Sequence, residues 1–288
     1  MPKFCYLLIM LTTVIVFAPS LAAQTAGDAA MYRVETSDGS IFVGELISEN
    51  EDSIVLRTES AGEITIRRES IISMTELNAS RVRNDTYWYE NPNPTRYLLT
   101  SNSLGLQKGQ GYYQNTWVFL NSLSYGVSDR FSLGVGTVPL FFFGGAATPV
   151  WLNSQLSAPV GDSNIHLSAG AIIGGIAGGG EGTAGGIFYG AGTYGTTDKN
   201  LTIGLGYDGS ISSTPVLNIG SMFRIAQKGY IITESYFFPG TDVNGLVSAG
   251  YRYAAETASV DFALLRPLED TGPFIGIPWL GITLPFGK

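Results

Sequence analysis

The pair of residues best suited to catalysis is His166 and Ser168, in the stretch NIHLSAG. Residues two positions apart on a β-strand point to the same face, so an imidazole at 166 would lie beside a hydroxyl at 168. A histidine placed in this way can take the serine proton and leave a nucleophilic oxygen. No Asn, Gln or Glu is clearly placed to orient the ring, so the pair is a catalytic candidate that lacks a third member.

A second group of candidates consists of charges on four successive predicted strands, namely Arg224, Glu234, Arg252 and Asp261. Folding the hairpins about their turns places Arg252 almost opposite Asp261, with Arg224 at a similar height and Glu234 about three residues away along the strand. If these side chains face the interior of a barrel, their mixed signs favour a structural network across the lumen. The alternative is a charged constriction of a pore.

Several other kinds of site are not expected. Cys5 is the only cysteine and precedes the mature chain, which excludes a disulfide, a thiolate nucleophile and a cysteine metal site. The glycine runs IIGGIAGGGEG and TAGGIFYGAGTYG have neither a following helix nor a lysine, so they do not form a phosphate cradle. The formal net charge of −8 argues against nucleic acid as a partner. We therefore expect no cofactor and no metal.

The N-terminal stretch, residues 1–23, has the features of a secretory signal peptide. Lys3 precedes an apolar run, and the small residues Ser20 and Ala22 suit signal-peptidase cleavage. After this leader no uncharged apolar run reaches about 18 residues, so no transmembrane helix is predicted. A membrane location would therefore have to be built from strands.

Residues 31–76 are predicted to form a small acidic β domain. Five short strand-like segments follow one another there, with four basic and ten acidic residues. We expect a periplasmic module that either docks onto a protein partner or braces the domain that follows. Residues 77–95 are predicted to be a linker whose aromatic residues, such as Trp88, lie at a membrane surface or against a barrel rim.

From Arg96 onward we count twelve segments with the alternation of β-strands, of which the first two are RYLLTSNSLGL and YYQNTWVFLNSLSYGV. An even number suits a closed antiparallel barrel with both chain ends on one side. Short polar turns such as SDR and TTDK alternate with longer connections such as QKGQG, FGGAAT and PGTDV. Bacterial outer-membrane barrels show this asymmetry, with the tight turns in the periplasm.

The two faces of these strands differ in composition. One carries large apolar residues such as Leu133, Ile203 and Phe262, and the other carries glycine, serine, threonine and the few charges. A water-facing surface made of the second set would be oddly poor in Lys and Glu, so the apolar face is predicted to meet lipid. The fold class is therefore all-β: a transmembrane antiparallel up-and-down barrel of about 12 strands over 96–288, preceded by the small periplasmic β domain.

Three resemblances add to this prediction. The leader, the small domain and above all GQGYYQNTWVFLNSLSYGVSDRFSLGVG resemble a group of outer-membrane β-barrel proteins of Bacteroidota-type bacteria, which implies a location and a fold but no activity. The layout DGSIFVGEL followed by SIVLRTESAGEITIRRESIISM resembles SH3-like or Sm-like small barrels. The alternating residues Leu280 to Phe286 resemble the terminal signal that barrel-insertion machinery reads, so this machinery and outer-membrane lipid are the expected partners.

Three classes of function remain. The first is a structural or adaptor barrel that displays residues 31–76 to a periplasmic protein, with a largely filled lumen. The second is a passive channel for small solutes. The third is a lipid-modifying hydrolase, because the spacing of His166 and Ser168 resembles the sites of outer-membrane phospholipase A and lipid A deacylase. Those enzymes act at the outer leaflet, whereas the pair here follows a predicted periplasmic turn.

Overall fold

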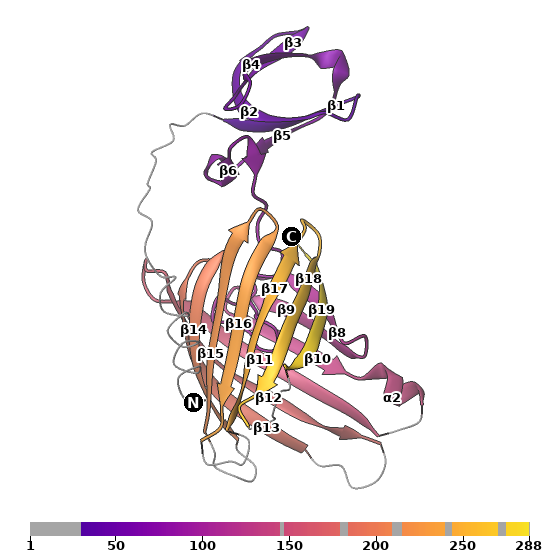
Figure 1. Ribbon diagram of the computed structural model, residues 1–288, viewed down its shortest axis with the longest axis vertical. Coiled ribbons are helices and arrows are strands. Elements are labelled where there is room, and N and C mark those ends of the chain that lie inside the picture. The colour runs from indigo at the N-terminus through magenta and orange to yellow at the C-terminus, as the bar shows by residue number, and fades with distance from the viewer. Residues whose placement is uncertain are drawn as a thin grey trace. The chain divides into compact units, whose positions relative to one another are not determined.

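The structure is a computed structural model, and it describes residues 30–144, 147–178, 184–208, 215–239, 244–269 and 275–287. The predicted signal peptide and parts of several long connections lie outside these ranges. The chain divides into two compact units, Met1–Tyr89 and Glu90–Lys288 (Figure 1). No helix among the described residues is both long enough and apolar enough to cross a bilayer.

The first unit contains a five-stranded antiparallel sheet in the order β4-β3-β2-β1-β5. Its elements are β1 (Met31–Thr36), β2 (Ile41–Glu49), β3 (Ser53–Thr58), β4 (Gly62–Arg67), the 3-10 helix η1 (Arg68–Ser70) and β5 (Ile71–Leu77). Alternating aliphatic residues on one face form its core around Val34, Ile54, Leu56 and Ile66. The expectation of five short strands ahead of the barrel is confirmed.

The segment after β5 is not a linker throughout. It forms the 3-10 helix η2 (Ala79–Arg81) and a hairpin of β6 (Val82–Arg83) and β7 (Thr86–Tyr87). Asn84 and Asp85 make the tight turn of this hairpin with φ of 50° and 54°, a conformation that Asn and Asp tolerate. The Asp85 carboxylate accepts hydrogen bonds from the backbone N–H groups of Glu59 (2.5 Å) and Ser60 (2.6 Å). Residues 78–89 are therefore a folded part of the first unit.

The pKa of the Asp85 carboxyl lies below its usual range. Burial acts to raise this pKa, but hydrogen bonds from the Ser60 side chain and from the N–H groups of Glu59 and Ser60 outweigh that effect. Because the folded-state pKa is lowered, the carboxylate stabilises the β3–β4 turn above the ordinary aspartate pKa. It loses this contribution as the pH falls through the lowered value.

Asp85→Asn is expected to loosen the β3–β4 turn. Asparagine keeps the backbone preference but is neutral and offers one acceptor oxygen in place of two, so both N–H groups lose a charged partner and one loses its acceptor, at a cost of about 1 kcal/mol. Amide hydrogen exchange at Glu59 and Ser60 in the full chain should accelerate about five-fold. Asp38→Asn, in the separate β1–β2 turn, should leave these two amides unchanged. Equal rates in wild type and Asp85→Asn would show that the carboxylate does not anchor the turn.

The second unit is a closed barrel of twelve antiparallel strands, as predicted (Figure 1). The last strand pairs with the first, from Gly281 opposite Thr116 to Phe286 opposite Gly111, which closes the sheet. Its elements are β8 (Gly111–Thr116), β9 (Leu120–Ser128), β10 (Phe131–Thr137), α2 (Pro139–Phe143), β11 (Thr148–Pro159), β12 (Ile165–Ala177), β13 (Ala184–Gly195), β14 (Lys199–Asp208), β15 (Pro215–Ala226), β16 (Gly229–Phe237), β17 (Gly245–Ala254), β18 (Ser259–Pro267) and β19 (Ile277–Phe286).

Two strand assignments near the start of the barrel were wrong. One predicted strand is absent and another is two strands, so the total of twelve is unchanged. The stretch RYLLTSNSLGL is not a strand, because its backbone hydrogen-bonds mainly to side chains rather than to a ladder. The stretch YYQNTWVFLNSLSYGV is two strands, β8 and β9, joined by a turn at residues 117–119. As a result QKGQG does not form a long connection. It leads into β8 at the end of the barrel where the short turns lie.

The two faces of the barrel are oriented as predicted. Leu133, Ile203 and Phe262 point outward and are 36%, 55% and 56% exposed. Small and polar residues such as Ser168 and Thr202 point inward and are buried. The barrel thus presents an apolar exterior around an interior of hydroxyls, amides and a few charges.

Candidate functional site: a plugged lumen

Residues 90–106, called the plug below, occupy the end of the lumen next to the short turns. The plug was predicted partly as linker and partly as the first barrel strand. Instead, its polar side chains are buried against inward-facing residues of the wall. Those buried in this way are Asn91, Asn93, Thr95, Arg96, Asn102 and Ser103. Asn91 donates to the backbone oxygen of Thr197 in the short β13–β14 turn (3.0 Å), so the plug enters the barrel at this end.

One anchor of the plug is Arg252, which is 0% exposed. Its Nε and Nη2 form a two-pronged ion pair with Asp261 on the neighbouring strand, at 2.6 and 2.9 Å. Its other N–H groups donate to the backbone oxygens of three plug residues, Asn93 (2.7 Å), Arg96 (3.2 Å) and Tyr97 (2.9 Å). A buried guanidinium is stable when every N–H has an acceptor and an anion lies beside it. Arg252 meets both conditions only with the plug in place.

The second anchor is Glu234, which is 1% exposed. Its Oε2 accepts from the N–H groups of Leu98 (3.0 Å) and Leu99 (2.7 Å). Its Oε1 accepts from the N–H of Thr100 (2.9 Å), the Thr100 hydroxyl (2.5 Å) and the Tyr236 hydroxyl (2.6 Å). Three consecutive plug N–H groups therefore converge on one carboxylate. A turn without ladder partners obtains its hydrogen bonds from the barrel wall in this way.

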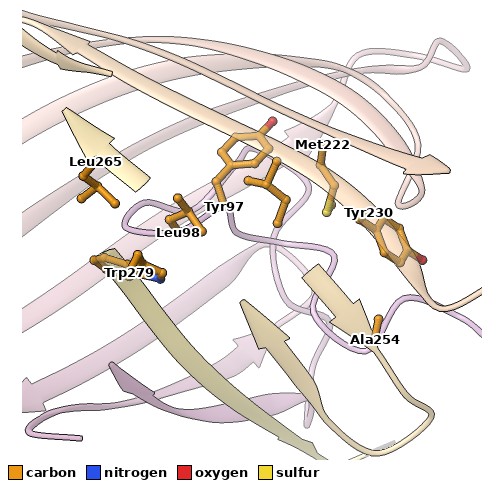
Figure 2. Packing of buried hydrophobic residues seen from close by; sticks show 8 residues of the cluster. Tyr97, Leu98, Met222, Tyr230, Ala254, Leu265 and Trp279 are labelled. Atoms are coloured by element: carbon orange, nitrogen blue, oxygen red, sulfur yellow. The ribbon is translucent and has the colours of Figure 1, made fainter. Parts of the chain in front are cut away.

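Apolar packing completes the attachment. Figure 2 shows Tyr97 and Leu98 among wall residues, with Leu98 between Tyr97 and Trp279. The Tyr97 ring lies so close to Gly220 of β15 that a Cβ there would come within 2.4 Å of the ring. The Tyr97 hydroxyl reaches Asn200 and Thr202 of β14, at 2.7 Å each. Glycine at 220 is therefore required for the plug to seat.

The predicted charge network differs from the one in the structure. Arg252 and Asp261 are cross-strand partners and form an ion pair. Glu234 bonds to the plug instead of to a cation, and Arg224 pairs with Asp198 in the short β13–β14 turn at 3.1 Å. The charges of the lumen thus hold the plug and a turn in place, rather than joining one another across the barrel.

The catalytic candidates are not assembled into a hydrolase site. Among the described residues no hydrogen bond joins His166 to Ser168, and the buried Nδ1 of His166 has no partner. The Ser168 hydroxyl is hydrogen-bonded to that of Ser103 in the plug, at 2.9 Å. A serine buried under the plug in this way is used for attachment, and the geometry gives no support to nucleophilic attack.

On the other side of the plug the lumen holds a cavity of about 280 Å³, called the cup below. Plug residues form its floor and aromatic and amide side chains form its wall. The floor is Arg96, Leu99, Thr100 and Ser101, and the wall includes Tyr112, Gln114, Ser122, Trp151, Asn153, Tyr189, Asn218, Tyr236 and Trp279. Asn218 and Tyr236 lie near strand ends that adjoin the longer β14–β15 and β16–β17 connections. The cup therefore lies toward these connections.

The plug is the functional element that sequence reasoning missed. Its signal was the run NPNPT followed by a dense set of serine, threonine and asparagine at 100–103, which is more polar than a lipid-facing strand allows. Buried charges on strands that face a lumen were a second signal, because each requires a partner.

Comparison with known proteins found matches among solved structures only. No protein-family model and no curated protein matches the chain. Among solved structures, the KdgM porin is 9% identical, covers 62% of this chain and 99% of its own, and has a TM-score of 0.46. A complex of Salmonella typhi OmpF with daunomycin is 11% identical over 90% and 96% of the two chains, with a TM-score of 0.36. The P. putida toluene transporter TodX is 8% identical over 89% and 86%, with a TM-score of 0.34. Such values say nothing about what this chain binds.

Proposed function

We propose that this protein is an outer-membrane barrel, closed by its own plug, that anchors a small β domain in the periplasm. The outward belt of apolar side chains supports the membrane location, because such a surface is stable in lipid and unfavourable in water. The buried plug supports the proposal that the lumen is closed. Short turns of bacterial barrels face the periplasm, and the chain enters at that end, so the first unit belongs on the periplasmic side.

The first unit fits the role of a displayed module. Register shifts in β1 and β2 bend its sheet, and β5 returns to pair with β1, which supports an SH3-like or Sm-like small barrel. Such a module would present its edges and loops to a periplasmic protein. A periplasmic crosslinking experiment through residues 31–76 should trap that partner. A chain lacking 31–76 that gives the same crosslinked products would contradict the adaptor role.

A second candidate function is a gated channel for small solutes. The plug contributes no strand to the barrel, since β19 pairs directly with β8. The plug can therefore leave the lumen without breaking the wall. The lumen would then be lined by hydroxyls, amides and the charges that now hold the plug, all of which water can solvate.

Deleting residues 91–105 is expected to turn a silent barrel into a conducting one. In planar bilayers the purified full chain should show no single-channel steps, because the plug blocks the end of the lumen next to the short turns. The deletion variant should show stable steps, because the wall closes without the plug. A wild type that conducts as strongly as the deletion variant would exclude a closed anchor. Wild-type steps that are rare and brief would favour the gated channel.

A further inference from the structure

We propose that the cup binds a small organic anion, namely a carboxylate carried on a flat apolar body. This site is distinct from the anchoring role proposed above. It depends on Arg96 in the floor of the cup and on the aromatic side chains of its wall.

Arg96 is the one buried lumen arginine among the described residues for which no ion pair is present. It is 8% exposed. Its Nη2 donates to the backbone oxygens of Leu98 (3.0 Å) and Leu99 (2.9 Å), and its guanidinium lies 5.6 Å from the centre of the Tyr112 ring. Its buried Nε has no acceptor. Arg252, by contrast, has a carboxylate and an acceptor on each of its nitrogens.

A buried cation without an anion is unfavourable, so its retention on a cavity floor indicates a ligand that supplies the negative charge. The carboxylate that binds the plug, that of Glu234, already accepts five hydrogen bonds. Arginine is the side chain best matched to a carboxylate, because its donors lie in one plane.

Trp279 gives an independent indication at the same cavity. It lines the cup, it is buried, and its Nε1 has no acceptor. Its ring packs edge-on against Trp117, with centroids 4.8 Å apart, which fixes its orientation. Two residues of the cup lining therefore carry a donor nitrogen without an acceptor, and none of its described residues carries an unsatisfied acceptor, which favours a ligand that only accepts.

The wall determines the rest of the ligand. Trp151 and Tyr189 line the cup together with Trp279, and aromatic rings of this kind pack best against flat apolar groups. Asn153 and Asn218 add a few polar contacts to the wall. Aromatic surface with a few placed polar groups is the usual composition of a small-molecule site.

The test compares two probes of the same shape on the full chain in detergent micelles. Titration calorimetry with 2-naphthoate should show binding that is at least about ten-fold tighter than with neutral 2-naphthamide. Arg96→Gln should weaken 2-naphthoate binding about ten-fold and leave 2-naphthamide nearly unchanged. Ser122→Trp, which fills the cup from β9, should abolish binding of both. Arg224→Gln removes a cation at the opposite end of the lumen and should change neither.

Three results would overturn the proposal. They are equal affinity for the two probes in the wild type, no binding of either probe, and unchanged 2-naphthoate affinity in Arg96→Gln. If Arg96→Gln does not fold, the wild-type comparison of the two probes and the Ser122→Trp variant still test whether the cup binds a carboxylate. None of these results depends on whether the barrel conducts, so they are separate from the test of the anchoring role.

Discussion

Replacing Arg252 by methionine should destabilise the barrel by about 3–5 kcal/mol, the usual cost of breaking a buried ion pair on one side. Methionine fills a similar volume, so the loss is mainly electrostatic. Asp261, which is 1% exposed, would keep a buried charge without its partner. The carbonyl groups of Asn93, Arg96 and Tyr97 would also lose their donor.

Urea unfolding of the full chain in phospholipid vesicles, followed by tryptophan fluorescence, measures this loss. The double variant Arg252→Met with Asp261→Leu should recover part of the stability, because no unpaired charge then remains buried. Arg224→Met is the matched control, since it breaks an ion pair whose aspartate is 30% exposed, and it should cost clearly less. Equal losses in Arg252→Met and Arg224→Met would show that Arg252 does not hold the plug.

The barrel could be predicted because its strands follow simple rules. Alternation fixes which side of each strand is apolar, and Leu133, Ile203 and Phe262 consequently lie outside. Turn residues mark the ends of most strands. The pairing of Arg252 with Asp261 could be predicted by counting residues back from the turn between their strands, because the turn of a hairpin fixes its register.

The β8–β9 turn could not be predicted, since it has no turn signal. Trp117 and Val118 adopt φ of 50° and 71°, which bulky residues rarely do. Tertiary contacts hold the turn instead. The Trp117 backbone N–H donates to Leu280 (2.9 Å), and its indole N–H donates to the backbone oxygen of Pro278 (2.6 Å). Both partners lie on β19, more than 160 residues away, so local sequence does not reveal them.

The plug was missed for a related reason. Tyr97, Leu98 and Leu99 beside threonine and serine have the composition of a strand, and their turn is stabilised by Glu234 from far along the chain. Contacts between residues far apart in the sequence also explain why the predicted charge network was wrong. Cross-lumen pairing was the simplest assumption for an empty barrel, but a filled lumen offers backbone groups as partners.

Glu234→Gln is expected to release the plug and produce single-channel steps in planar bilayers where the wild type is silent. Glutamine has the same shape, but an amide NH₂ replaces one oxygen. At least two of the donors from Leu98, Leu99, Thr100 and Tyr236 then lose their acceptor and face another donor. Each buried unsatisfied group costs about 1–3 kcal/mol, which is large for a segment with no strand ladder.

A disulfide lock decides whether those steps pass through the space that the plug vacates. The hydroxyls of Ser103 and Ser168 are 2.9 Å apart, so cysteines at both positions should form a disulfide between plug and wall. Added to Glu234→Gln, this pair should silence the channel when oxidised, and a reducing agent should restore the steps.

Gly220→Ile, which collides with the Tyr97 ring, should also open the lumen, whereas Gly204→Ala on β14 should not, because its added Cβ finds room at 3.4 Å. If the variant with the oxidised disulfide still conducts, the current does not pass through the plugged lumen. If both Glu234→Gln and Gly220→Ile are silent, neither contact retains the plug.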